Sequence, residues 1–176
     1  MKNILFALLI PALTYAQKIE RNQVDEFTRT KHIETKCQNL VLGAEDATIA
    51  IKVRSIDGRI LLRVYWMLVS SIAHHNIYSI GSDDHLMLLL SDSTVISLKP
   101  TEGQMTCLGC GACGFAGSSA YGTSTEYRLS VETIDRLLEH DVFKMRMYTS
   151  KGYVVQIIDY DRRDFIAKHL KLVLGT

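Results

Sequence analysis

The chain of 176 residues has little that would divide it into parts or carry it through a bilayer. It contains only two prolines, Pro11 and Pro100, and no Pro- or Ser-rich linker, which favours one domain over residues 17–176. Beyond its first residues it has no apolar run near the roughly 20 residues that a membrane-spanning helix needs. We therefore expect no transmembrane segment in residues 17–176.

An excess of charge of one sign is also missing. The sequence has 20 Lys and Arg residues against 19 Asp and Glu residues. Without Lys2, which lies in a segment that we expect to be removed, the count is 20 − 1 = 19 basic residues against 19 acidic ones. There is no basic stripe or polybasic segment, so neither nucleic acid nor an anionic membrane surface is an expected partner.

The motifs of common catalytic and cofactor sites are absent as well. The histidines form neither an HxxxH nor an HExxH pattern, and no serine stands in a GxSxG elbow. The glycines precede no phosphate-binding GK[ST] motif, and the acidic pairs lack the spacing of a calcium loop. We expect a non-enzymatic protein without a bound cofactor, and a hydrolase without a readable signature ranks last among the functional hypotheses.

The N-terminus has the features of an export signal. Lys2 supplies a positive charge, residues 4–10 are apolar, and small residues lead up to Ala16. This pattern predicts a signal peptide over residues 1–16 that is cleaved after Ala16. No cysteine follows directly, so lipoprotein anchoring is not supported. We expect a secreted or periplasmic protein.

The clearest secondary-structure signal is a pair of β-rich runs over residues 48–69 that are joined by Asp57-Gly58. Such a dipeptide predicts a hairpin with a type I′ turn, because both turn residues need a positive φ. Residues 25–28 are expected to form a turn that places Phe27 in the core. Further strands are expected at residues 32–37, 84–90, 94–98, 123–129, 142–148 and 153–158.

Two helices are expected among these strands. A short helix at about residues 130–140 has Ser130 as its N-cap and an apolar stripe at helical spacing. A C-terminal helix at about residues 161–174 begins after a cap at Asp159 or Asp161. The predicted fold class is α+β, a predominantly antiparallel sheet built from hairpins with both helices packed on it.

The C-terminal half carries a resemblance. Tyr127-Arg128-Leu129-Ser130 steps from a strand into a helix, residues 144–149 alternate basic residues up to Tyr-Thr, and residues 153–174 add a strand and a closing helix. This arrangement resembles small uncharacterised exported (periplasmic or secreted) α+β domains. The likeness implies a fold and no mechanism. The cysteine-rich loop is not part of it.

That loop holds the residues with the most distinctive chemistry. Cys107, Cys110 and Cys113 recur at three-residue spacing among glycines, and Cys37 is the only other cysteine. In an exported protein an even number of cysteines favours disulfides, and four cysteines allow three pairings among which the sequence does not choose. If Cys37 lies near the loop, one long-range pair and one local pair use all four. We favour this reading, in which disulfides staple the loop.

Two other readings of the loop stay open. Three thiolates can wrap around zinc or monovalent copper, with Cys37 or His75 as a fourth ligand. Alternatively, Cys110 and Cys113 could exchange disulfides, although the residues after Cys113 form a poor helix and so would not lower the pKa of a thiol.

The functional hypothesis is a binding protein. The chain is expected to have a well-formed core, a neutral surface and no convergent reactive groups, which favours an exported domain that binds another protein or cell-surface material. Lys144 and Arg146 share one side of a strand and form either a small basic patch or a solvated face. The sequence predicts no oligomeric state.

Overall fold

The structure is a computed structural model that describes residues 18–42, 47–68, 77–113 and 121–175, so the predicted signal peptide lies outside the described residues. Strands make up 53% of the described residues and helices 16%, which confirms a sheet-dominated α+β fold. The helices are α1 (Val131–Glu139) and α2 (Phe165–Leu174). The strands are β1 (Ile19–Val24), β2 (Lys31–Thr35), β3 (Gln38–Leu42), β4 (Ala47–Ile56), β5 (Arg59–Leu68), β6 (Ser79–Ile80), β7 (Leu86–Leu90), β8 (Val95–Leu98), β9 (Gln104–Met105), β10 (Cys107–Leu108), β11 (Tyr121–Arg128), β12 (Val142–Thr149) and β13 (Gly152–Ile157).

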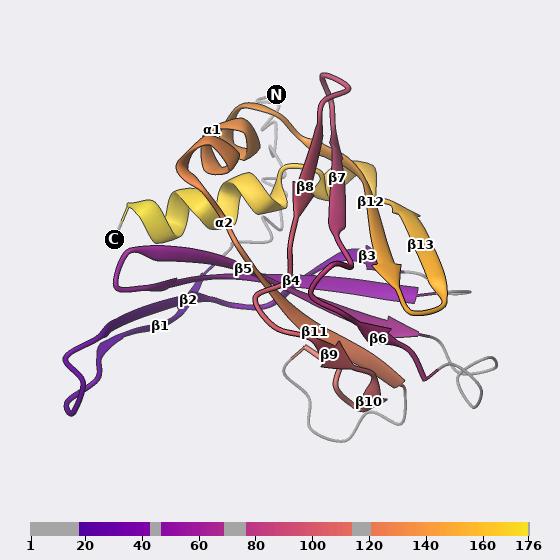
Figure 1. Cartoon of the computed structure of the whole chain (residues 1–176). Helices are drawn as coiled ribbons and strands as arrows, with labels where there is room; N and C mark the ends of the chain where they lie inside the picture. The colour runs from indigo at the N-terminus through magenta and orange to yellow at the C-terminus, as the bar shows by residue number, and fades with distance from the viewer. Residues whose placement is uncertain (1–17, 43–46, 69–76, 114–120, 176) are drawn as a thin grey trace, which may run out of the picture.

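The larger sheet has seven strands in the order β1-β2-β4-β5-β11-β10, with β3 also paired to β4. Its centre is the predicted hairpin, in which β4 and β5 pair from Ala47↔Leu68 to Ile56↔Arg59. Asp57 (φ 49°) and Gly58 (φ 75°) both have a positive φ, which confirms the predicted turn type. All the pairings in this sheet are antiparallel, and Figure 1 shows it as the lower layer of the molecule.

One edge of β4 is shared by two strands in succession. β2 pairs with the end of β4 at Arg54–Ile56, whereas β3 pairs with its beginning at Thr48–Ile51. The two strands together form one strand beside β4 that is interrupted at Lys36 and Cys37. The Thr35 hydroxyl fills the interruption, because it accepts a hydrogen bond from Val53 N (3.0 Å) where the ladder stops.

The smaller sheet has four strands in the order β13-β12-β7-β8. The predicted hairpins β7–β8 and β12–β13 are both present, and β12 pairs with β7 to join them. On one face of this sheet Leu86, Leu88 and Met145 are fully buried. The opposite face presents the alternate residues to solvent. A third pair, β6–β9, is short.

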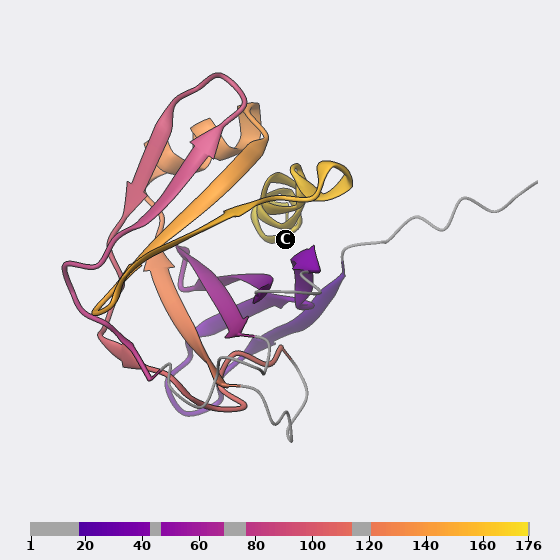
Figure 2. The same cartoon turned by 90° about the vertical axis from the view of Figure 1, so that its right-hand side faces the viewer.

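The helices lie on the same side of the seven-stranded sheet as the four-stranded sheet (Figures 1 and 2). Ser130 caps α1 as predicted, because its hydroxyl accepts from Thr133 N (3.2 Å). α2 contacts α1, β4 and β2. It begins at Phe165 after Asp164, so the expected start near residue 161 is wrong, and residues 160–162 form a short 3-10 turn instead.

The remaining differences are strands that the sequence analysis does not predict, namely β1, β3, β6, β9 and β10. The sequence gives no sign of β1, because five of its six residues are exposed and its apolar residues do not alternate. The loop around residues 104–108 contains β9 and β10 in place of irregular chain. Among the described residues, no helix has both the length and the apolar character needed to cross a membrane.

Candidate functional site at the disulfide-strapped sheet

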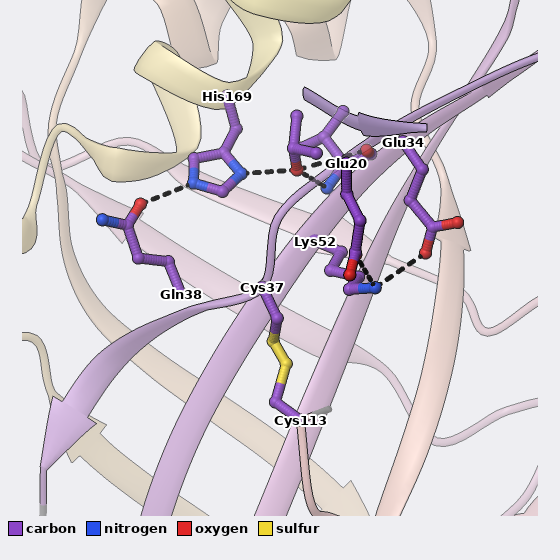
Figure 3. Close-up of a disulfide and its surroundings, with 9 residues drawn as sticks. Glu20, Glu34, Cys37, Gln38, Lys52, Cys113 and His169 are labelled. Atoms are coloured by element: carbon purple, nitrogen blue, oxygen red, sulfur yellow. Dashed lines mark hydrogen bonds and ion pairs between the residues drawn. A yellow bond between two sulfur atoms is a disulfide. The ribbon is translucent and has the colours of Figure 1, made fainter. Parts of the chain in front are cut away.

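The structure brings the four cysteine sulfurs together in two pairs. Cys37 is joined to Cys113, 76 residues away, with Cα atoms 6.0 Å apart, and Cys107 is joined to Cys110, with Cα atoms 5.3 Å apart. This is one long-range and one local disulfide, one of the three pairings that the sequence left open. No described cysteine is free. Figure 3 shows the long-range bond beside the interruption between β2 and β3.

The long-range disulfide ends a strap, residues 107–113, that lies across the sheet face opposite to α2. The strap starts at β10, which pairs with β11 at Cys107↔Gly122. It then passes over the backbone of β5, where a Cβ on Gly111 would come 2.3 Å from Trp66 O. Only glycine fits at this close approach. The strap reaches Cys37 on the far side of β4 and so spans most of the sheet's width.

The same face carries a row of alternating charges. Lys52 contacts Glu34 (3.1 Å) and Glu20 (2.5 Å), and farther along the row Glu126 is paired with both Arg54 and Arg63. Burial alone would lower the pKa of Lys52, but its hydrogen bonds to the two carboxylates outweigh burial and raise that pKa. Every cation in the row has a carboxylate partner, so the row stabilises the sheet and leaves no charge for a ligand.

On the opposite side of the interruption, α2 places the fully buried His169 between the buried Thr35 and the half-buried Gln38. His169 Nδ1 lies 2.7 Å from Thr35 Oγ1, and Nε2 lies 2.7 Å from Gln38 Oε1. Because the amide oxygen only accepts, Nε2 donates and Nδ1 accepts from the hydroxyl. Burial lowers the pKa of His169 to about 4, so the ring is neutral at physiological pH. Figure 3 shows His169 next to Gln38 on one side of this stretch of chain, and the disulfide from Cys37 to Cys113 on the other.

A hydroxyl, an imidazole and an amide in this order resemble a hydrolytic triad, but they cannot act as one here. Thr35 and His169 are both 0% exposed, and the hydroxyl already accepts from Val53 N. A substrate carbonyl therefore has no route to the hydroxyl oxygen. The cluster ties α2 to the sheet at the place where the ladder is interrupted.

A second hydroxyl–imidazole pair lies on the outer face of the four-stranded sheet. Ser97 Oγ is 2.6 Å from His85 Nδ1, and Ser97 is exposed. Among the described residues, no carboxylate or amide is bonded to the other ring nitrogen to orient the imidazole. Without that third group the pair lacks the arrangement that activates a serine.

A shallow hollow of about 260 Å³ opens beside the long-range disulfide. Cys37 and Cys113 line it together with Arg162, which the sequence analysis did not connect with the cysteines. Arg162 is paired with Asp159 (3.4 Å) and also bonds to Asn39 O (3.4 Å). Its charge is therefore already balanced, and the hollow offers little to bind an anion.

The site residue that sequence reasoning placed wrongly is Phe27. It lies at the tip of the β1–β2 hairpin and is 96% exposed, so the expectation that it enters the core is wrong. The turn around it is held by Asp25, whose carboxylate accepts from Phe27 N (2.9 Å) and Thr28 N (2.7 Å). These bonds, those from Thr28 first, lower the pKa of Asp25. Phe27 stands alone among polar residues in the sequence, and this isolation is the one signal that predicts an exposed position for it.

The metal reading of the loop finds no cluster in the part of the chain that the structure describes. No three histidine, cysteine or acidic side chains there could hold one ion. Cys107, Cys110 and Cys113 are divided between two disulfides, and His75 lies outside the described residues. Binding of zinc or copper by these thiols would first require both pairs to be reduced.

Comparison with models of protein families, with curated proteins and with solved structures found no match to this chain.

The long-range disulfide should stabilise the fold far more than the local one. Replacing Cys37 and Cys113 by serine should lower the free energy of unfolding by about 4–5 kcal/mol, because a long loop is released in the unfolded chain. Replacing Cys107 and Cys110 should cost only about 1–2 kcal/mol, since that loop is short. Urea unfolding of the unreduced variants measures both values, and equal losses would contradict the pairing.

The same unreduced protein tests the metal alternative. We expect thiol titration under denaturing conditions to find no free thiol. Elemental analysis should find no stoichiometric zinc or copper. One ion and three or more titratable thiols per chain would instead support a metal site in the loop.

Gly111→Ala should destabilise the protein, because the added methyl group meets the Trp66 carbonyl at 2.3 Å and the strap must shift. We expect a loss of about 1–3 kcal/mol in the free energy of unfolding. Gly103→Ala is the matched control, since the nearest atom to its Cβ is 3.5 Å away. Thermal and urea unfolding compare the two, and equal stability of both variants would refute the close approach.

The buried histidine should make stability fall as the pH falls. The pKa of His169 is about 4 in the folded protein and near 6.5 when unfolded, so the unfolded chain binds the proton first. Its contribution is fully present above pH 6.5 and should decrease by about 2–3 kcal/mol between roughly pH 7 and pH 4.5. Urea unfolding at several pH values measures this slope. In His169→Gln the slope should largely disappear, whatever the stability of that variant at pH 7, and an unchanged slope would contradict the assignment.

Proposed function

We propose that this chain is an exported binding protein without catalytic chemistry, and that the tip of the β1–β2 hairpin is its contact element. The observation that carries the proposal is the 96% exposure of Phe27 at the end of a projecting hairpin. Aromatic residues, Phe among them, are enriched at protein interfaces, where a few anchors in well-packed pockets carry most of the binding energy.

The turn beneath Phe27 supports this role, because it is already ordered. Asp25 accepts three hydrogen bonds from Phe27 and Thr28, and its backbone is bonded to Arg29 and Thr30. Arg29 has a positive φ of 58°, as a tight turn requires. A contact loop that is fixed before binding loses little conformational entropy in the complex, and this loss otherwise weakens association.

The proposed location, secreted or periplasmic, rests on the cysteines. Disulfides persist in oxidising compartments, and the described part of the chain leaves no cysteine unpaired. The partner that we propose is a protein or cell-surface material, because the formal charge of +1 gives no general attraction to nucleic acid or to acidic lipid.

The absence of catalysis is proposed from the chemistry of the two hydroxyl–imidazole pairs. Thr35 and His169 are enclosed in the core, and Ser97 and His85 have no third group in the described chain to orient the ring. Neither arrangement joins an accessible nucleophile to an oriented base, which acyl transfer requires.

Phe27→Ser should strongly weaken binding and leave the fold intact. The ring is 96% exposed, so its removal takes away almost no packing within the folded chain. We expect at least a tenfold loss of retention on the cell-envelope fraction of the producing organism. Val131→Ser is the matched control, since Val131 is an apolar side chain that is 76% exposed on α1.

Retention is measured with the purified, unreduced proteins, and circular dichroism and melting temperature verify that each variant is folded. The control should bind as the unchanged chain does. Equal retention of both variants, or hydrolysis of ester or peptide substrates by the unchanged chain, would contradict the proposed function.

A further inference from the structure

The outer face of the four-stranded sheet carries an apolar hollow of about 220 Å³. Met87 and Leu89 on β7 and Val155 on β13 line it, on the two sides of the strand β12. Val95, which is 51% exposed, stands at its margin. The hollow is too small for a drug-sized ligand and is of the size of one large side chain. It is therefore suited to a single aromatic anchor from another protein.

Two cations flank this hollow. Lys144 and Arg146 alternate along β12 and point to the same face, where Arg146 pairs in register with both Met87 and Val155. Neither cation forms an ion pair with a described carboxylate, whereas every cation of the row on the seven-stranded sheet does. Arg146 instead lies over the ring of Tyr153, 4.8 Å from its centroid. The occupant that these charges favour is an apolar side chain next to an acidic one.

The β1–β2 hairpin tip of this same chain has that composition. Phe27 is the most exposed large apolar side chain among the described residues, and Glu26 beside it is exposed and has no partner there. Residues 25–29 hold two acidic residues against Arg29 alone, so the tip is net negative. We propose that the hairpin tip of one copy docks into the hollow of a second copy, with Phe27 as the anchor and Glu26 facing Lys144 and Arg146.

This inference rests on the proposed function and names a second copy of the chain as the partner of the tip. The hairpin projects at the lower left of Figure 1, and β12 and β13 stand at the right, so one molecule cannot fill its own hollow. Tip and hollow are different surfaces, and the contact is therefore head-to-tail. Such a contact leaves a free tip and a free hollow at the two ends, so that it propagates into chains or closes into rings.

Sedimentation velocity of the unreduced full chain tests the proposal over the micromolar to millimolar range. The mean mass should rise with concentration and pass beyond that of a dimer. Phe27→Ser should remain monomeric, and so should Lys144→Glu/Arg146→Glu. Val95→Glu, which places a carboxylate at the margin of the hollow, is a second way to block it if the double variant is unstable. Val131→Ser should associate as the unchanged chain does.

Mixing the variants separates this contact from any other mode of association. Phe27→Ser keeps an intact hollow, and Lys144→Glu/Arg146→Glu keeps an intact tip. An equimolar mixture of these two monomers should therefore form a one-to-one dimer and nothing larger. Glu26→Lys should weaken association at least tenfold. The Glu26→Lys variant should bind Lys144→Glu more tightly than it binds the unchanged chain, because the lysine at position 26 then faces a glutamate at position 144.

The proposal is overturned if the unchanged chain stays monomeric throughout, if association stops at a symmetric dimer, or if the mixed variants do not combine. A chain that stays monomeric and yet loses envelope retention through Phe27→Ser would remove the second copy as the partner. The proposed function would survive that result. If Phe27→Ser keeps both its self-association and its envelope retention, both the proposed function and this inference are wrong.

Discussion

The structure depends on the interruption at Lys36 and Cys37 between β2 and β3, which both pair with β4. A strand that breaks its ladder leaves backbone groups without partners and lets its two parts move independently. Here the Thr35 hydroxyl accepts from Val53 N, and two attachments on opposite faces of the sheet hold the two parts in place. The disulfide from Cys37 to Cys113 attaches the strap on one side, and the cluster of Thr35, His169 and Gln38 attaches α2 on the other. Elements that are distant in the sequence therefore meet at one point.

These two attachments differ in what they do. The disulfide restricts the unfolded chain and does not depend on pH, whereas the histidine cluster requires the neutral ring and therefore weakens on acidification. Together they fix β2, from which the β1–β2 hairpin projects. A projecting hairpin on its own is marginally stable, so a rigid base is what keeps the tip in one conformation.

The sequence predicted the elements whose physics is local. Asp57-Gly58 specifies its own turn, and Ser130 marks a helix start, because the positive φ values and the cap are properties of a few neighbouring residues. β1 and the strap could not be predicted in this way. β1 is an edge strand without a buried face, so it has no apolar alternation to detect. The strap is specified by contacts of Gly111 with a strand far away in the sequence.

The same distinction explains why the candidate site was predicted only in part. Four cysteines were visible as a set, but their pairing depends on how the chain brings Cys37 to the loop, which composition does not contain. The composition predicts a core position for Phe27, because large apolar residues usually lie there, but no periodic apolar partner accompanies it in the sequence. One apolar residue in a polar run of chain has no apolar neighbour in sequence to pack with, and the structure leaves it exposed at the tip of a hairpin.

The balance of charge over the whole chain conceals a difference between the two sheets. In the charge row on the seven-stranded sheet, Lys52, Arg54 and Arg63 alternate with carboxylates and are neutralised by them, as Lys52 is by Glu34 at 3.1 Å. On the four-stranded sheet Lys144 and Arg146 stand among apolar side chains without a described carboxylate. A partner that covers an already paired charge gains no binding free energy from it. A partner that brings an anion to an unpaired cation beside an apolar hollow gains a new ion pair. Specificity on this molecule is therefore expected where the charges are unbalanced, and a sum over the sequence cannot locate that place.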